Sequence, residues 1–197
     1  MLSVQYAARG ICTAPGQRKI FVVDYDASWP LTFAALRAPI WEALQGIALS
    51  VEHVGSTSVS GLAAKPIIDI DVVVPSRAEI PATVERLADL GYVHCGDLGI
   101  EDREAFKSPV GLPAHHLYAC VQGCVALANH LTLRECLRRN PATAAAYGQV
   151  KKKLAEQFPT DIESYVAGKT DFLLEVLRGA GLPETVLLTV RNANRRK

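Results

Sequence analysis

The segment VEHVGSTSVSGLAAKPIIDIDVVV, residues 51–74, places two carboxylates inside an apolar run. Its last nine residues are rich in β-branched side chains and are followed by Pro75, as expected of a buried strand. Side chains two positions apart on a strand share a face, so Asp69 and Asp71 point the same way. Neighbouring like charges repel, and a buried unpaired charge is costly. This face therefore opens into a cleft or holds a cation; salt bridges on a solvated face are the alternative.

The turn before this strand has the composition of a phosphate-binding loop. Gly55 allows a ligand to approach the backbone closely, while Ser56 and Thr57 add hydroxyls to successive backbone N–H groups. Such turns often bind nothing. This one is a candidate site because Asp69 follows it closely in the sequence. Mg²⁺ prefers carboxylate oxygens and shares its other positions with water and substrate phosphates. Lys65 has two open roles, as a phosphate contact or as a structural counter-charge for Asp69.

Strand-like segments dominate the first two thirds of the chain and helical ones the last third, which predicts an α+β fold. We expect strands at residues 19–26, 47–54, 66–74, 92–95 and 115–121. We expect helices at residues 29–44, 77–91, 127–139, 141–158 and 161–181, with Pro39 kinking or splitting the first. The segment EDREAFKSP, residues 101–109, is expected to be a polar loop.

This pattern suggests four parts. Residues 1–18 are expected to form a loose leader, residues 19–125 the core, residues 126–190 a helical cap or subdomain, and residues 191–197 a solvated basic tail.

Several side chains outside the acidic strand are candidates for substrate contact. His115 and His116 alternate on a strand, so at most one of them faces the acids, where it would act as a base or ligand. The candidates on the expected loop and helices are Arg103, Lys107, Asn129, Arg134 and Lys169. For the loop charges the alternative is solvation; for Lys169 it is a stabilising contact with Tyr165 one turn earlier.

The motifs resemble those of a known family. Val54-Gly55-Ser56, followed after a dozen residues by Asp69-Ile70-Asp71-Val72, is similar to the signature of the nucleotidyltransferase superfamily that includes the β-type polymerases. The match is closer to the GrpB-like proteins, also called the UPF0157 family, and extends over residues 20–180. It rests on residues 51–74 and on HHLYAC, NHLTLRECLRRNP, AYGQVKKKLA and YVAGKTDF.

The resemblance implies a nucleotidyltransferase-like core, with a short mixed β-sheet flanked by helices and a helical C-terminal region. It implies phosphate contacts from Gly55 and Ser56 and metal ligation by Asp69 and Asp71. Active members of the superfamily often carry a third carboxylate on a later strand. The segment 115–121 has none here, and His115 or His116 is the available substitute.

Composition limits the classes of partner and compartment. The 197 residues carry a formal net charge of +1, which favours neither nucleic acid nor an anionic membrane as a partner. Five cysteines at irregular spacing, and an N-terminal stretch without the pattern of a signal peptide, indicate the cytoplasm. No apolar run reaches the roughly 18 residues of a transmembrane helix.

Together these features predict a Mg²⁺- or Mn²⁺-dependent nucleotidyltransferase with ATP as the expected substrate. Phosphates would lie on Gly55, Ser56, Thr57 and Lys65, the metal ion on Asp69 and Asp71, and His116 would complete the catalytic group. The acceptor would be a small molecule or a protein, and activation of a carboxylate for ligation is one form of the reaction. The alternative is a catalytically silent nucleotide-binding or protein-interaction module on the same fold.

Overall fold

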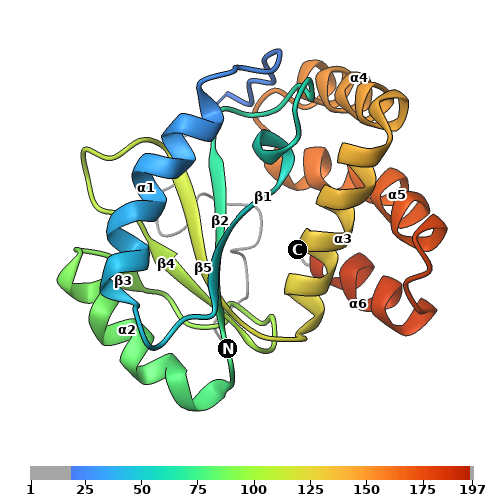
Figure 1. Ribbon diagram of the computed structural model, residues 1–197. Helices are drawn as coiled ribbons and strands as arrows, with labels where there is room; N and C mark the ends of the chain where they lie inside the picture. Colours follow the sequence, from blue (N-terminus) through green and yellow to red (C-terminus); the bar gives the residue numbers. More distant parts are fainter. Residues whose placement is uncertain (1–18, 196–197) are drawn as a thin grey trace.

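The structure is a computed structural model that describes residues 19–195; the side chain of Arg195 is not described. The expected leader, residues 1–18, and the last two residues of the expected tail lie outside this range. A central sheet separates two groups of helices (Figure 1). The N-terminal helices α1 and α2 lie on one side of it, and the C-terminal helices α3 to α6 lie on the other.

The sheet is mixed and has five strands in the order β1-β2-β5-β4-β3. They are β1 (Ser50–Val54), β2 (Ile68–Val74), β3 (Val93–His94), β4 (Arg103–Lys107) and β5 (His115–Val121). The two central strands, β2 and β5, are parallel, and the other neighbours are antiparallel. Asp69 therefore lies on a central strand with hydrogen-bonded neighbours on both sides.

The register of the strands makes one face of the sheet polar. Asp71 lies opposite Glu52 of β1 and Tyr118 of β5, and Asp69 lies opposite His116. Because residues in register share a face, these side chains all project toward the C-terminal helices. The C-terminal helices cover this polar face, so solvent can reach it only where the helices do not pack against the sheet.

The opposite face of the sheet forms the largest apolar core. Ile68, Ile70 and Leu117 pack there against α1 (Trp29–Ala43) and α2 (Ile80–Asp89). Ile40 and Leu44, at and just after the end of α1, are fully buried in this core. Burial of a large aliphatic side chain stabilises the fold by about 1.5–3 kcal/mol, so this face holds β2 firmly in place.

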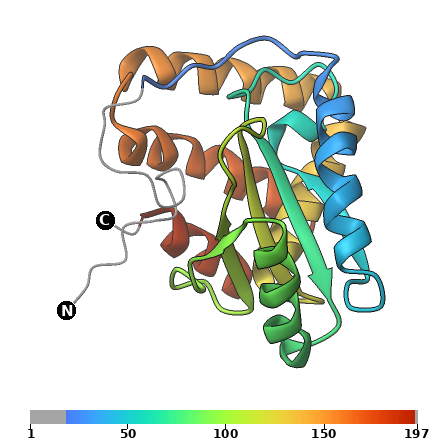
Figure 2. The same ribbon diagram turned by 90° about the vertical axis from the view of Figure 1, so that its left-hand side faces the viewer.

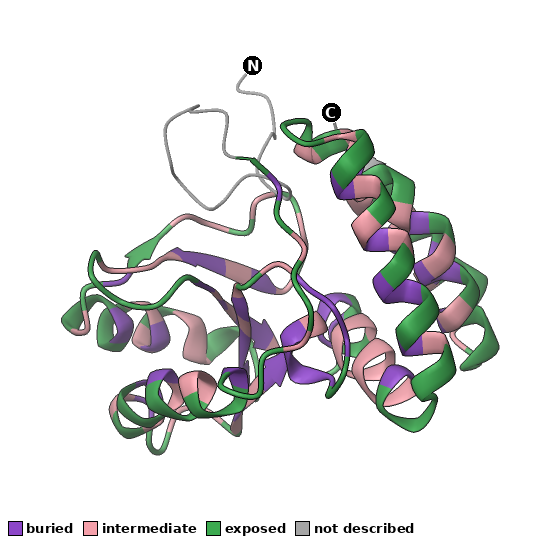
Figure 3. Cartoon of the chain, turned by 90° about the horizontal axis from the view of Figure 1, so that it is seen from above, coloured by how far each residue is buried: buried purple, intermediate pink, exposed green. Residues whose placement is uncertain are grey.

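The C-terminal helices are α3 (Val125–Arg139), α4 (Pro141–Gln157), α5 (Ile162–Gly179) and α6 (Glu184–Arg195). Side chains of Asn140 and Asp161 cap α4 and α5 by accepting hydrogen bonds from backbone N–H groups. Buried residues line the strands and the inward sides of these helices, and exposed residues cover the outer sides (Figure 3). A short 3-10 turn, η1 (Ser56–Ser58), follows β1 near α4 (Figure 2). A second, η2 (Arg77–Glu79), precedes α2.

One predicted strand and one predicted loop differ from the structure. Residues 19–26 form no strand, since their backbone bonds go to separate partners: Ile20 N–H donates to Pro159 O, and Val23 exchanges bonds with Ala64. The expected loop at 101–109 contains strand β4 instead. Side chains in this strand alternate between the two faces of the sheet: Phe106 enters the core, while Arg103 and Ala105 lie on the polar face. The charged residues made this alternation difficult to predict.

Two further corrections concern helices. Pro39 lies inside α1 and does not split it, so of the two predicted effects the split is wrong. The expected basic tail is helical as far as Arg195, because α6 packs Leu187 and Val190 against the buried leucines of α5.

The strand predicted at 47–54 begins only at Ser50, whereas the strand at 115–121 has the predicted bounds.

Candidate functional site

A cavity of about 1300 Å³ lies between the polar face of the sheet and the C-terminal helices. Its lining includes Gly55, Ser56 and Asp69 on the sheet side and Asn129, Lys151 and Lys169 on the helices. The predicted phosphate turn and the first acid therefore face the same space.

Gly55 fixes the distance between the turn and the acidic strand. Its φ of 68° and ψ of −171° belong to a region that only glycine adopts readily. A Cβ atom at this position would lie 2.2 Å from Oδ2 of Asp69. Any side chain would thus collide with the carboxylate, and glycine brings the backbone of the turn directly against it.

Asp69 forms a hydrogen bond with His116 across the β2–β5 junction. The Nδ1 atom of His116 donates to Oδ1 of Asp69 over 2.8 Å, and both side chains are partly exposed. Burial raises the pKa of Asp69, but His116, Lys65 and His130 outweigh this effect and bring the pKa below its usual value. Asp69 is therefore ionised at neutral pH.

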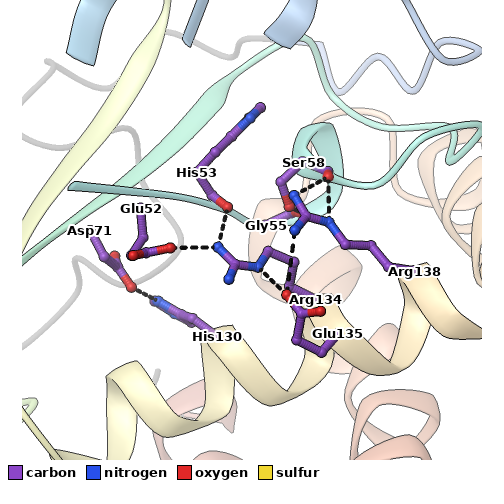
Figure 4. Close-up of polar contacts among 9 residues, drawn as sticks. All are labelled: Glu52, His53, Gly55, Ser58, Asp71, His130, Arg134, Glu135 and Arg138. Atoms are coloured by element: carbon purple, nitrogen blue, oxygen red, sulfur yellow. Dashed lines mark hydrogen bonds and ion pairs between the residues drawn. The ribbon is translucent and has the colours of Figure 1, made fainter. Parts of the chain in front are cut away.

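Asp71 is fully buried and forms a second carboxylate–histidine pair. Nδ1 of His130, on α3, donates to Oδ2 of Asp71 over 2.7 Å (Figure 4). Burial lowers the pKa of His130, yet the charge and the hydrogen bond of Asp71 raise it overall. Oδ1 of Asp71 is buried and has no hydrogen-bond partner among the residues that the structure describes. The two acids thus share a face as predicted, but only Asp69 lines the cavity.

These acids are chemically suited to a divalent cation. Within residues 19–195 Oδ1 of Asp71 lacks a hydrogen-bond partner, and Asp69 engages His116 through Oδ1 while Oδ2 lies against Gly55. Among the described residues, no group of three or more His, Cys, Asp or Glu side chains is arranged to hold a metal ion. A cation on the two acids would therefore draw its remaining ligands from water and substrate phosphates.

Helix α3 is fastened to the sheet by residues one turn apart, His130, Arg134 and Arg138. Nη1 of Arg134 donates to Glu52 and to the backbone oxygen of His53, each over 2.9 Å. Arg138 donates to the backbone oxygen of Ser58 at the end of the turn. Figure 4 shows these contacts reaching β1, β2 and η1 from one side of the helix. The helix therefore positions both the turn and Asp71.

Three lysines from different elements approach the turn. Nζ of Lys151, on α4, donates to Oγ of Ser56 over 2.7 Å. Lys65 and Lys169 lie on the ring of Tyr165, with Nζ 5.9 and 5.4 Å from its centroid. The predicted contact between Tyr165 and Lys169 is thus confirmed, and Lys169 also lines the cavity.

The other predicted contacts divide into two groups. Arg103 and Asn129 line the cavity. Arg103 is buried, its guanidinium lies 4.3 Å from the centroid of the Tyr118 ring, and its Nε and Nη2 atoms have no hydrogen-bond partner among the described residues. Two predicted contacts do not line the cavity: Lys107, the last residue of β4, and Arg134, which is engaged with Glu52.

His115 is also directed away from the site. It is buried on the apolar face, where Nδ1 donates to Pro113 O and Nε2 accepts from Tyr92 Oη. The prediction that only one of the two histidines faces the acids is confirmed, and His116 is that residue. The hydroxyl of Thr57 also points inward, to His53 Nε2 and Ile67 O, although Thr57 borders the cavity.

Three residues of this site were missed by the sequence analysis: Glu52, His130 and Lys151. His130 precedes Arg134 by one helical turn, which is the signal that would have found it. Lys151 begins a run of three lysines and lies one turn after Tyr147, on the buried side of α4. Glu52 shares a face with Asp71 only through the β1–β2 register.

Comparisons with known proteins agree on the family. The model of the GrpB protein family matches residues 19–178. GrpB from Enterococcus faecalis, a solved structure, superposes with a TM-score of 0.74 at 32% identity, covering 81% of this chain and 96% of that one. A UPF0157 protein of Streptomyces coelicolor, SCO7215, is 35% identical over 87% of this chain and 89% of its own length. The α+β chain therefore belongs to the GrpB family.

Some relatives are considerably longer than the matched region. The chain spans 46% of the UPF0157 protein YqkA of Bacillus subtilis and 66% of PA4798 of Pseudomonas aeruginosa, at 32% and 36% identity. The Cid1 poly(U) polymerase, solved with MgATP, superposes at a TM-score of 0.43 and 13% identity over 66% of this chain and 45% of its own.

None of the described helices combines the length and the apolar character needed to cross a membrane.

Proposed function

We propose that this protein is a Mg²⁺-dependent nucleotidyltransferase that moves a nucleoside monophosphate from a nucleoside triphosphate to an acceptor. The observation that carries the proposal is the contact between Gly55 and Asp69. It joins a backbone turn suited to phosphate with an ionised carboxylate suited to a metal ion, at the wall of one cavity.

In this proposal the phosphates lie on the turn and the metal ion on the strand. Gly55 and Ser56 contact the phosphates, Thr57 borders them through its backbone, and Lys65 supplies positive charge. Asp69 and Asp71 hold Mg²⁺, with Mn²⁺ as a substitute, once the His130 side chain yields access to Asp71. Bound there, the cation would neutralise phosphate charge and polarise the α-phosphate.

The transfer itself exchanges one phosphorus–oxygen bond for another. An acceptor oxygen attacks the α-phosphorus, the bond to the α–β bridging oxygen breaks, and pyrophosphate leaves with its electron pair. With a hydroxyl acceptor, His116 receives its proton on Nε2 while Nδ1–H stays on Asp69, an orientation supported by the 2.8 Å hydrogen bond; an ionised carboxylate acceptor carries no proton and needs no base. Asp69 thereby has two roles, in metal ligation and in orienting the base.

Arg103 supports an anionic acceptor. Its buried guanidinium borders the cavity and has two nitrogen atoms without a partner in the described part of the chain, which a carboxylate or a phosphate would satisfy. A carboxylate on a small molecule or a protein would leave as an acyl nucleotide, activated for ligation. The near-neutral net charge disfavours a polynucleotide. ATP is the nucleotide that we propose, and the free described cysteines support a reducing, cytoplasmic setting.

A specific observation favours a second candidate, a catalytically silent nucleotide-binding or protein-interaction module. Each acid is already paired with a histidine, and no third carboxylate joins them among the described residues. In that case nucleotide would bind on the turn without being cleaved.

Pyrophosphate release separates the two candidates. The protein, Mg²⁺ and each nucleoside triphosphate are incubated with pooled small metabolites, with Asp69→Asn/Asp71→Asn as the matched variant. The transferase predicts pyrophosphate formation that requires both the metal ion and the aspartates. Nucleotide binding with no release from any pool would favour the silent module.

A further inference from the structure

Lys65, Lys151 and Lys169 line the same cavity as the phosphate turn and are called the lysine pocket below. They come from the segment before β2, from α4 and from α5, and all three border the cavity. Lys151 is 2% exposed, and the other two are half-buried. Lys151 touches Ser56, so the pocket is continuous with the turn.

The lysine pocket brings three basic side chains together, while the cavity that it borders is also lined by five acids, Asp69, Glu101, Asp102, Asp161 and Glu163. No ion pair joins any of the three ammonium groups to a carboxylate within the described part of the chain, and Asp69 is the acid whose charge acts on all three. The remaining polar groups that face Lys151 are Tyr147, with its ring centroid 4.5 Å from Nζ, and Ser56. Lys65 and Lys169 are half-buried cations, and such groups are normally paired, which points to an anion from outside as the missing partner.

We propose that the lysine pocket receives the terminal phosphates of a polyphosphate chain and that Lys151 takes up a proton from solvent when they bind. The step forms one N–H bond: a proton from solvent adds to the lone pair of Nζ, and a neutral amine becomes an ammonium beside the anion. The inference rests on the proposed function for the rest of the nucleotide, but the polyphosphate alone suffices to test it.

The protonation states of the lysines support this order of events. Burial, together with the charges of Lys169 and Lys65, lowers the pKa of Lys151 to about 6. Burial and Lys65 lower the pKa of Lys169 to about 8, and burial lowers that of Lys65. At pH 7.5 Lys151 is therefore mostly neutral in the free protein. A bound polyanion favours the charged form and raises the pKa again.

Titration calorimetry with inorganic tripolyphosphate, without divalent metal, tests the proposal directly. Binding is measured at pH 7.5 in Tris and in Hepes, whose different ionisation enthalpies report the number of protons taken up. The wild type is compared with Lys151→Met, and with Lys152→Met as the matched control, because Lys152 pairs with exposed Asp24 outside the pocket.

The wild type and Lys152→Met are expected to take up about one proton more per bound tripolyphosphate than Lys151→Met. Protons bound by tripolyphosphate itself cancel in this difference. Lys151→Met should also bind about tenfold or more weakly, because one charge-assisted contact is lost. Circular dichroism establishes that each variant is folded.

Two results would overturn the inference: equal proton uptake by the wild type and Lys151→Met, or no tripolyphosphate binding by the wild type. The same titration on Asp69→Asn/Asp71→Asn separates the lysine-pocket inference from the proposed function. If this variant still binds tripolyphosphate and the wild type shows no nucleotidyl transfer, the transferase proposal is rejected and the lysine-pocket inference is retained.

Discussion

At the scale of single residues, Gly55 carries the structural link between the phosphate turn and Asp69. Its backbone conformation and the 2.2 Å approach of a Cβ atom to the carboxylate both exclude a side chain. The turn and Asp69 can therefore lie this close only because residue 55 has no side chain.

Gly55→Ala is expected to lower the free energy of unfolding by at least about 2 kcal/mol, because it adds backbone strain and a collision with Asp69. Gly61→Ala is the matched control: Gly61 also has a positive φ, of 77°, but a Cβ atom there meets nothing within 4 Å. Denaturant unfolding of both variants measures the difference. Equal losses would show that the approach to Asp69 has no energetic effect.

Lys151 is expected to weaken the fold near neutral pH. Its pKa falls from 10.5 to about 6 on folding, so the unfolded chain binds the extra proton and stability rises with pH between these values. Lys151→Met should therefore increase the free energy of unfolding, by roughly 2–4 kcal/mol at pH 7 and by less at pH 10. Urea titrations at both pH values measure it, and a gain that grows with pH would contradict the assignment.

The acids and the turn could be predicted because their relation is local in sequence. Strand alternation places Asp69 and Asp71 on one face and separates His116 from His115. His130 and Lys151 could not be placed, since their positions depend on how α3 and α4 dock on the sheet. The same limit left Arg134 as a predicted substrate contact when it is a structural clamp.

At the scale of elements, α3 aligns the site by holding three segments from one side. Arg134 joins Glu52 of β1 and the backbone of His53, while His130 holds Asp71 of β2. The Arg134 and Glu52 side chains are mostly buried. Loss of Arg134 therefore leaves the Glu52 carboxylate without its ion-pair partner, whereas Arg134 keeps a second partner, Glu135, when Glu52 is lost.

Arg134→Met is expected to cost about 1–3 kcal/mol of stability, whereas Arg139→Met, exposed on the same helix, should cost little. The double variant Arg134→Met/Glu52→Gln should lose less than the sum of the two single variants, because neither charge is then left alone. Thermal or denaturant unfolding of the four variants measures the coupling. Strict additivity would mean that the Arg134–Glu52 pair contributes nothing.

Elements with a clear local period were predicted closely, and those that depend on a partner were not. Strand β5 has its predicted bounds, whereas the apolar run at 19–26 has no neighbouring strand to pair with. Strand β4 has charged ends, and its pairing with β5 supplies the order that its sequence does not indicate. Helix α6 is held by the leucines of α5.

At the scale of the whole molecule, the site exists only because the sheet and the C-terminal helices face each other across the cavity. The sheet supplies Ser56, Asp69 and His116, while the helices supply Lys151 and Lys169. The division into a core at residues 19–125 and a helical part at 126–190 is accordingly a proposal about how the chain folds. Neither part alone contains the full set of groups proposed to bind nucleotide.

The most direct test of the central claim is nucleotide affinity measured with and without Mg²⁺, for the wild type and for Asp69→Asn. A non-hydrolysable ATP analogue titrated into each protein isolates binding from chemistry. The proposed site predicts that Mg²⁺ strengthens binding to the wild type by tenfold or more, about 1.4 kcal/mol, and has little effect on Asp69→Asn. An affinity that is the same with and without Mg²⁺, and is unchanged by loss of the Asp69 carboxylate, would contradict the metal site.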